Sequence, residues 1–287
     1  MFEFRIPYKE NYFNAYSINH ELTNTPIYFS HANGFNGLTY RTLLEKISVN
    51  QKIISYDLRG HGKSTIPADP EKLKSWHRYG DDLINILSQN QEPSVLIGHS
   101  LGGTTSLLVA LKRPELVSKI ILIDPVLLPL TYWLGTKAMQ TIGLIEKIHP
   151  MVRGALIRKN NWTSKEEAFE YFSGKKLFRK VIPEALTDYI EGGIKQIGNN
   201  NYCLGCDPKW EAATFKLTAG EIWFNLKKID IPTKIILTPN SYVCNKSSQK
   251  KLARYLTKME IVTIDNTTHM LPLEDIDSVS NEISRFL

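Results

Sequence analysis

The sequence has only three cysteines in 287 residues, Cys203, Cys206 and Cys244, which are too few for a disulfide framework. It has no run of about 18 apolar residues, so we expect no membrane-spanning segment. Its first residues show no basic start followed by an apolar run and a small-residue cleavage site, so we expect no signal peptide. These absences predict a soluble, cytoplasmic protein.

Blocks of like charge are also missing. The formal net charge is +6, but lysine and arginine are scattered along the chain. Scattered charge is typical of a solvated basic surface, and a bias toward anionic substrates or partners is the alternative. We therefore expect a small-molecule substrate rather than nucleic acid, and the oligomeric state stays open.

Apolar runs of strand length alternate with amphipathic stretches over most of the chain. Several of these runs are continuous, which is typical of strands covered on both faces. The alternation predicts an α/β fold with a mostly parallel, doubly wound sheet. Strands are expected at Phe2–Ile6, Phe13–Ile18, Ile27–Ser30, Lys52–Tyr56, Ser94–Gly98, Lys119–Ile123, Lys234–Thr238 and Glu260–Ile264, and helices at Leu38–Ile47, Trp76–Leu87, Leu101–Leu111 and near the C-terminus.

The alternation stops between about Leu127 and Leu226. This stretch has helical patterns, for example at Lys165–Phe172 and Glu184–Ile194, and no clear strand, and Gly198–Tyr202 is expected to be a loop. It predicts a helical cap over residues 127–226, inserted in a core domain of residues 1–126 and 227–287. Four of the five tryptophans fall in it, which indicates either an aromatic-lined pocket beneath the cap or ordinary packing of cap against core: Trp133, Trp162, Trp210 and Trp223.

The segment Ser94–Gly103 contains the G-x-S-x-G pattern of a nucleophile elbow, with Ser100 between Gly98 and Gly102. The pattern follows an expected strand and opens an expected helix, as an elbow requires. Small residues must flank a nucleophile on so tight a turn, and the helix N-terminus stabilises negative charge beside it. Ser100 is therefore the candidate nucleophile, and a structural serine in a glycine-rich turn is the alternative.

A second small-residue loop follows the strand in Pro26–Gly37. Charge that develops on a carbonyl oxygen needs preorganised N–H donors. We expect one donor from the backbone of Leu101 and another from Asn33, whose side chain could add a third. Phe35 is the alternative to Asn33, and a plain strand-to-helix turn is the structural alternative.

His269 lies in the last loop, after the expected strand Glu260–Ile264 and after the serine in chain order, so it is the candidate general base. Three other histidines flank the other motifs and are expected to serve turn geometry and hydrogen bonding: His31, His61 and His99.

The acid that should orient His269 is not where it is usually found. The loop after Lys234–Thr238 has no carboxylate, and Ser241 stands about where an acid is expected. Asp124 follows the preceding strand and lies at the edge where catalytic groups gather in open α/β sheets. We therefore assign the acid to Asp124, with Asp265 as the weaker alternative and a capped turn as the structural one.

Four segments together resemble the α/β-hydrolase superfamily: HANG, YDLRGHGKS (Tyr56–Ser64), GHSLGG and THMLPLED (Thr268–Asp275). The resemblance implies the α/β-hydrolase fold, with the cap inserted after the sixth strand. The place of the acid resembles that in a subset of lipases and of haloalkane dehalogenases. Dehalogenases and epoxide hydrolases need an aspartate nucleophile, and Ser100 stands at that position.

These motifs predict a serine hydrolase that cleaves a carboxylic ester or thioester of a small to medium acyl group, with no metal or cofactor. Two other functions stay open. One is hydrolysis of a carbon–carbon bond by the same residues, and the other is a catalytically inactive small-molecule binding protein. The CxxC pattern of Cys203 and Cys206 lacks a second Cys/His pair for zinc and the strand–helix context of a redox motif, so we interpret it as incidental packing.

Overall fold

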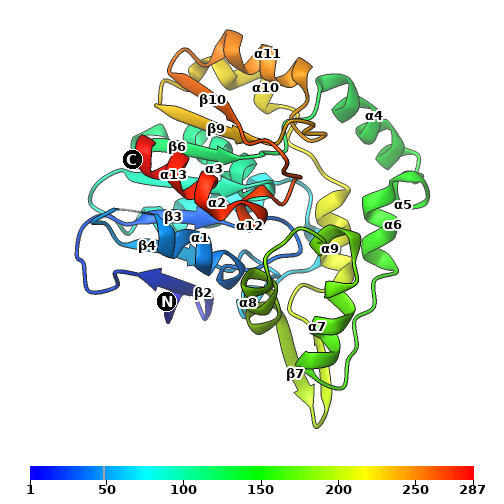
Figure 1. Ribbon diagram of the computed structural model, residues 1–287. Helices are drawn as coiled ribbons and strands as arrows, with labels where there is room; N and C mark the ends of the chain where they lie inside the picture. Colours follow the sequence, from blue (N-terminus) through cyan, green and yellow to red (C-terminus); the bar gives the residue numbers. More distant parts are fainter. Residues whose placement is uncertain (48) are drawn as a thin grey trace.

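A computed structural model describes residues 1–47 and 49–287. Its centre is an 8-stranded sheet in the order β1-β2-β4-β3-β5-β6-β9-β10 (Figure 1). β2 is antiparallel to β1 and β4, and the other pairs are parallel, so the predicted doubly wound sheet is confirmed. The strands are β1 (Phe2–Tyr8), β2 (Asn11–Ile18), β3 (Ile27–Ser30), β4 (Ile53–Tyr56), β5 (Ser94–His99), β6 (Val117–Ile123), β9 (Thr233–Leu237) and β10 (Met259–Thr263).

Alternate side chains of the central strands point into two separate apolar clusters. In β6, Ile120 and Leu122 belong to one cluster, and Ile121 and Ile123 belong to the other. A strand whose two faces are both buried has a continuous apolar sequence, which is why the sequence reveals these strands clearly.

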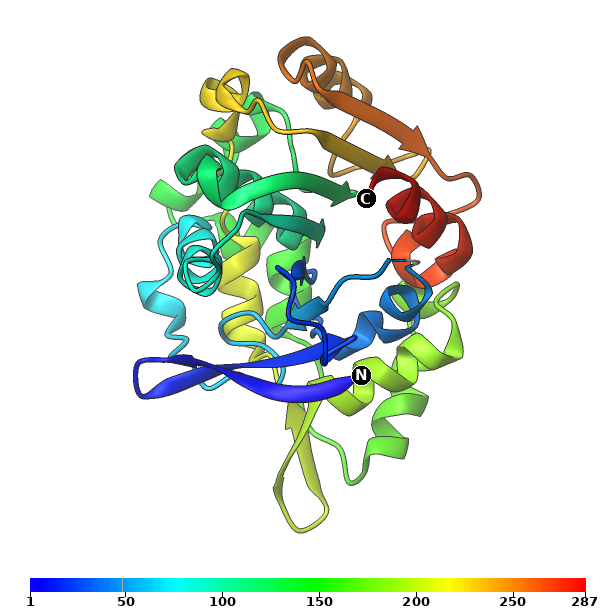
Figure 2. The ribbon, with the colours of Figure 1, turned by 90° about the vertical axis from the view of Figure 1, so that its left-hand side faces the viewer.

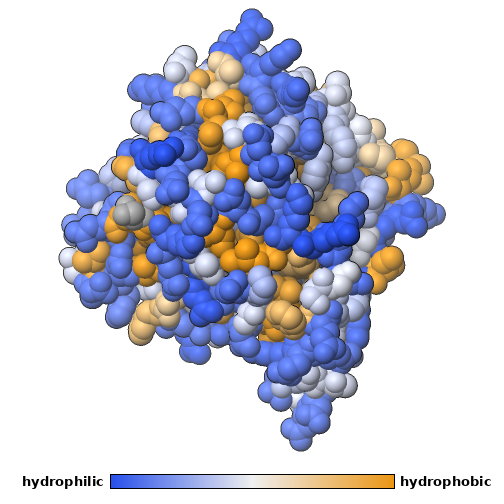
Figure 3. Space-filling model, in the orientation of Figure 1, coloured by the Kyte–Doolittle hydropathy of each residue, from blue (hydrophilic) through white to orange (hydrophobic). Residues whose placement is uncertain are grey.

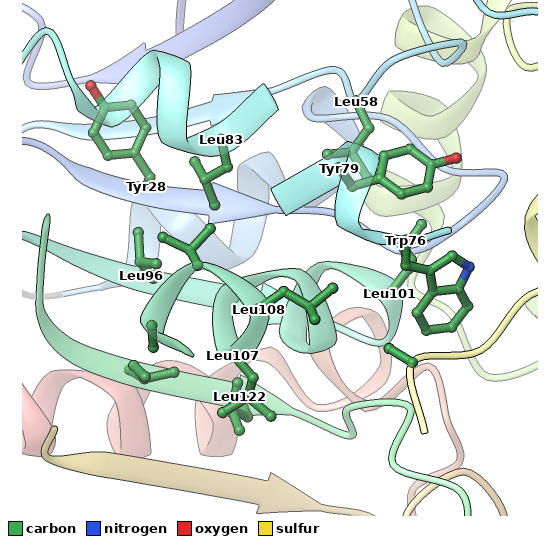
Figure 4. Close-up of a cluster of buried hydrophobic side chains, with 14 of the residues drawn as sticks. Tyr28, Leu58, Trp76, Tyr79, Leu83, Leu96, Leu101, Leu107, Leu108 and Leu122 are labelled. Carbon is green, nitrogen blue, oxygen red and sulfur yellow. The ribbon is translucent and has the colours of Figure 1, made fainter. Parts of the chain in front are cut away.

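Helices cover both faces of the sheet. One layer consists of α2 (His77–Leu87), α3 (Leu101–Lys112) and α11 (Lys246–Tyr255), and the other of α1 (Arg41–Lys46), α12 (Leu271–Glu274) and α13 (Ile276–Phe286). Figure 2 shows α2 and α3 on one side of the sheet and α1 and α13 on the other. In the first layer, Leu107 and Leu108 of α3 meet Leu83 of α2 and Leu122 of β6 (Figure 4).

The segment between β6 and β9 carries the remaining elements, most of which extend beyond one end of the sheet (Figure 1). They are α4 (Leu130–Thr141), α5 (Ile145–Ile148), α6 (Pro150–Leu156), α7 (Lys165–Ser173), α8 (Pro183–Gly193), β7 (Ile194–Gly198), β8 (Asn201–Leu204), α9 (Pro208–Phe215) and α10 (Ile222–Asn225).

Two local expectations were wrong. β7 and β8 form an antiparallel hairpin where no strand was expected, and β8 takes up part of the expected loop Gly198–Tyr202. Only Ile194 and Leu204 of the hairpin strands are buried, so the hairpin lacks the continuous apolar pattern of the buried strands. The helix expected over Leu38–Ile47 is a 3-10 turn, Leu38–Tyr40, followed by α1.

In the part of the chain that the structure describes, no helix is long and apolar enough to cross a membrane.

Candidate active site

Ser100 lies between β5 and α3, on a backbone with φ 56° and ψ −116°. A residue other than glycine rarely adopts a positive φ, and such backbone strain is typical of functional sites. Its neighbours have no room for a side chain, because a Cβ at Gly102 would lie 2.0 Å from the carbonyl oxygen of Ser30, and one at Gly98 would lie 2.3 Å from the backbone of Gly102. The turn therefore requires both glycines, and it places Ser100 at the N-terminus of α3.

The structure brings Ser100, His269 and Asp124 into one hydrogen-bonded row. His269 Nε2 lies 2.9 Å from Ser100 Oγ, and His269 Nδ1 lies 2.6 Å from Asp124 Oδ2. A carboxylate can only accept, so Nδ1 carries the proton and Nε2 is free to accept the serine hydroxyl.

Asp124 is fully buried directly after β6, with φ 40°, and its N–H donates to the carbonyl oxygen of Ile236 at 2.8 Å. Its other oxygen, Oδ1, has no hydrogen-bond partner among residues 1–47 and 49–287. Ser241 instead accepts the N–H of Cys244 at 2.9 Å, and Asp265 is exposed. The structure thus places Asp124, rather than Asp265 or Ser241, beside the imidazole.

The two expected oxyanion donors, Asn33 and Leu101, line the same cavity as Ser100. Neither backbone N–H has an acceptor among the described residues. The side-chain amide of Asn33 donates to the carbonyl oxygen of Glu211 at 3.2 Å, which engages one of its two N–H donors. The N–H of Phe35 donates to Ala32 at 3.1 Å, which favours Asn33 over Phe35.

His99 connects the oxyanion loop to the loop of His269. Its Nε2–H donates to the carbonyl oxygen of His269 at 2.8 Å, and its Nδ1 accepts the hydroxyl of Tyr40 at 2.7 Å. The same hydroxyl accepts the N–H of Ala32 at 3.3 Å. Burial holds the pKa of His99 well below its usual value, so the ring is neutral and can accept and donate at once.

The other two histidines hold the loops beneath the site. His61 Nε2 accepts the N–H of Gly34 at 3.1 Å, and burial lowers the pKa of His61 to about 4. His31 Nε2 accepts the N–H of Leu58 at 2.9 Å, and burial lowers its pKa as well. Both therefore have the hydrogen-bonding role expected from the sequence.

A largely apolar cavity of about 370 Å³ opens above Ser100 and His269. Its aromatic lining includes Trp76 from the core domain, whereas the four tryptophans between β6 and β9 are not among the lining residues. It also contains Arg158 and Glu211, an ion pair at 3.0 Å that the sequence did not reveal.

Cys203 and Cys206 are both free thiols away from this cavity. Burial raises the pKa of each thiol, which disfavours the reactive thiolate. No group of three or more His, Cys, Asp or Glu side chains suited to a metal ion occurs within the described residues.

The profile of the family described as "Serine aminopeptidase, S33" matches residues 30–276. The mouse (Mus musculus) protein named sn-1-specific diacylglycerol lipase ABHD11 is 24% identical over 265 residues, which cover 90% of this chain and 78% of that protein. The 2-(acetamidomethylene)succinate hydrolase of Mesorhizobium japonicum is 30% identical over 263 residues, which cover 89% of this chain and 84% of that protein.

Solved structures show the same architecture. The thioesterase domain from the curacin biosynthetic pathway superposes with a TM-score of 0.80 at 15% identity, and the match covers 99% of this chain and 98% of that domain. At this level of identity the likeness shows the fold alone, which is that of the α/β-hydrolases.

Proposed function

The chain belongs to the serine aminopeptidase S33 family of α/β-hydrolases, and from this premise we propose that it is a serine hydrolase. Its proposed substrates are carboxylic esters or thioesters of a small to medium acyl group. The hydrogen-bonded row of Ser100, His269 and Asp124 carries the proposal.

In the proposed first half-reaction, His269 Nε2 takes the proton of Ser100 Oγ as the oxygen attacks the substrate carbonyl. Asp124 keeps the ring in the tautomer that accepts at Nε2, and it stabilises the imidazolium. The N–H groups of Asn33 and Leu101 bind the oxyanion. His269 then gives its proton to the leaving alcohol or thiol, and the acyl group stays on Ser100.

In the second half-reaction, water releases the acyl group. His269 Nε2 takes a proton from the water as its oxygen attacks the ester carbonyl, and the same two N–H groups bind the second oxyanion. The proton returns to Ser100 as the acid leaves. Side chains, backbone N–H groups and water supply every group that the two half-reactions need.

The geometry favours this activity over a catalytically inactive binding protein. Only the missing carboxylate after β9 suggested inactivity. Asp124, which directly follows the neighbouring strand β6, lies 2.6 Å from His269 and supplies a carboxylate there. Residues 127–226 are the proposed cap over the cavity. The cytoplasm remains the predicted location.

A fluorophosphonate probe tests the proposal. The wild-type protein should be labelled and should hydrolyse p-nitrophenyl esters of graded chain length. Ser100→Ala should abolish both, whereas Ser241→Ala, the matched control at a serine near the site, should keep both. Folded wild-type protein that is neither labelled nor active on esters, thioesters or diketones would contradict the proposal. Activity on diketones alone would indicate a carbon–carbon hydrolase.

A further inference from the structure

One ion pair of oppositely charged side chains lines the largely apolar cavity. Arg158 follows α6, and Glu211 lies in α9. The two helices pack against each other through Val152, Ala155 and Ala212. Arg158 and Glu211 line the same cavity as Ser100, so a ligand bound to Ser100 can also reach the pair.

The two partners differ in how far they are covered. The Glu211 side chain is 2% exposed, whereas that of Arg158 is 24% exposed. A guanidinium carries five N–H donors. Among the described residues its polar neighbours include the Glu211 carboxylate at 3.0 Å, the hydroxyl of Tyr189 and the thiol of Cys206. These groups cannot occupy all five donors, so donors remain for a ligand in the cavity. A buried guanidinium that serves only to stabilise the fold is expected to have its N–H donors paired with acceptors in the protein.

The pair also lies beside the proposed oxyanion loop. The carbonyl oxygen of Glu211 accepts the amide of Asn33, and a Cβ at Gly34 would lie 2.6 Å from Glu211 Oε1. A polar group on a substrate of modest length can therefore reach Arg158 while its carbonyl lies at Ser100. The cavity lining is largely apolar and suits a short methylene chain.

We propose that Arg158 binds a carboxylate of the substrate, so that the enzyme prefers esters or thioesters with a free acid group a few methylenes from the scissile bond. A guanidinium matches a carboxylate through two parallel hydrogen bonds, which a neutral ester cannot form as strongly. Glu211 is the positioning residue that holds the guanidinium when the cavity is empty. This inference rests on the proposed function for its reaction.

Matched esters test the preference. In one arm the acid is on the acyl side, with p-nitrophenyl hydrogen glutarate compared with p-nitrophenyl pentanoate. In the other it is on the alcohol side, with carboxymethyl pentanoate compared with ethyl pentanoate. In at least one arm, the wild type should have a higher kcat/KM for the acid than for its neutral counterpart. Arg158→Gln should lower this ratio at least about tenfold, mainly by raising KM for the acid. The kcat/KM for the neutral ester should change by less than about threefold.

Three further variants separate recognition from folding. Arg158→Lys keeps the charge without the planar fork and should lose most of the preference. The double variant Arg158→Gln with Glu211→Gln leaves no unpaired buried charge, so it should fold even if Arg158→Gln does not, and it should also lack the preference. Arg153→Gln, at an exposed arginine of α6, is the matched control and should behave as wild type.

A binding measurement separates this inference from the proposed reaction. In the Ser100→Ala background, calorimetry should show monoethyl glutarate or carboxymethyl pentanoate binding more tightly than its neutral counterpart, and the difference should vanish on Arg158→Gln. Equal binding with and without Arg158 overturns the carboxylate site whether or not the wild type is active. A preserved difference in a protein that hydrolyses no ester supports the site and contradicts the reaction.

Discussion

The floor and the roof of the cavity are held in different ways. The floor consists of strand ends and tight turns whose polar groups are buried and bonded to one another, as in the chain from Ala32 through Tyr40 and His99 to His269. The roof helices α4–α6 carry apolar side chains that face outward, with Leu134 of α4 54% and Ile148 of α5 53% exposed. Figure 3 shows apolar surface at the right-hand edge, where Figure 1 places these helices.

This contrast indicates that the floor and the roof of the cavity have different functions. Atoms that take part in bond cleavage must be held to fractions of an ångström, and a buried network on a rigid sheet does so. A surface that only selects substrates tolerates looser packing. Substitutions in the floor should therefore cost much more than comparable substitutions in the roof.

The largest effect is expected at Asp124. Asp124→Asn removes the carboxylate that fixes the tautomer of His269, so kcat should fall by about 10³–10⁴ while the fold is kept. Steady-state kinetics on the best p-nitrophenyl ester measure the loss. Asp265→Asn, the exposed alternative, is the matched control and should stay within a few-fold of wild type. Unchanged turnover in Asp124→Asn would mean that another group orients His269.

A methyl group at Gly102 should destabilise the floor. Because its Cβ would lie 2.0 Å from the Ser30 carbonyl oxygen, α3 or β3 must shift. We expect a loss of about 3 kcal/mol or more in the free energy of unfolding, measured by urea denaturation. A loss below about 1 kcal/mol would show that the elbow is less tightly packed than the distances indicate.

His61 should make stability depend on pH. Its pKa is about 4 when folded against 6.5 as the ordinary value, so the unfolded chain binds the extra proton between these pH values. Stability therefore falls as pH drops through this window, by up to roughly 3 kcal/mol for one histidine. Urea unfolding at several pH values should show a shallower fall in His61→Gln than in wild type.

Comparing wild type with His61→Gln isolates the contribution of His61 to the pH dependence of stability. Asp57 and Asp188, whose pKa values burial raises to about 6, act in the opposite direction, and the difference between the two proteins cancels them. His149, a roof histidine that is 9% exposed and lines the cavity, supplies the matched variant His149→Gln, which should change the slope less because its ring borders the open cavity. Equal slopes in wild type and His61→Gln would refute the buried, neutral state.

The smallest effect is expected in the roof. Gly135 lies inside α4, and a Cβ there would meet no atom within 4 Å. Gly135→Ala should therefore stabilise α4 by about 0.5–1 kcal/mol, because alanine loses less backbone entropy in a helix. Hydrogen exchange of the α4 amides measures the gain. A loss as large as that at Gly102 would remove the contrast between floor and roof.

Much of the sheet and of the helices that cover it could be predicted because burial leaves a pattern in consecutive residues. The run Ile120–Ile123 serves two opposite faces of one strand, so every position is apolar, and all eight expected strands are present with ends displaced by at most two residues. Ser100, His269 and Asp124 could be chosen because each follows a recognisable strand. Their catalytic roles remain predictions.

The rest depends on contacts between residues far apart in the chain. Nothing near Tyr40 indicates that its hydroxyl meets His99, and nothing near Arg158 indicates Glu211, 53 residues later. The β7–β8 hairpin was missed because only Ile194 and Leu204 of its strands are buried, too few to give a continuous apolar run. Such features arise from tertiary packing and edge exposure, and local sequence patterns do not encode either one.

The positions of β6 and β9 have an evolutionary consequence. These strands are hydrogen-bonded neighbours, yet more than a hundred residues lie between them in the chain. The inserted segment leaves the carboxyl end of β6 and returns to the amino end of the neighbouring β9, because the two strands are parallel. It can be lengthened, shortened or exchanged by recombination without altering the order of the strands, so new specificities can arise in this lineage while the chemical steps are inherited intact.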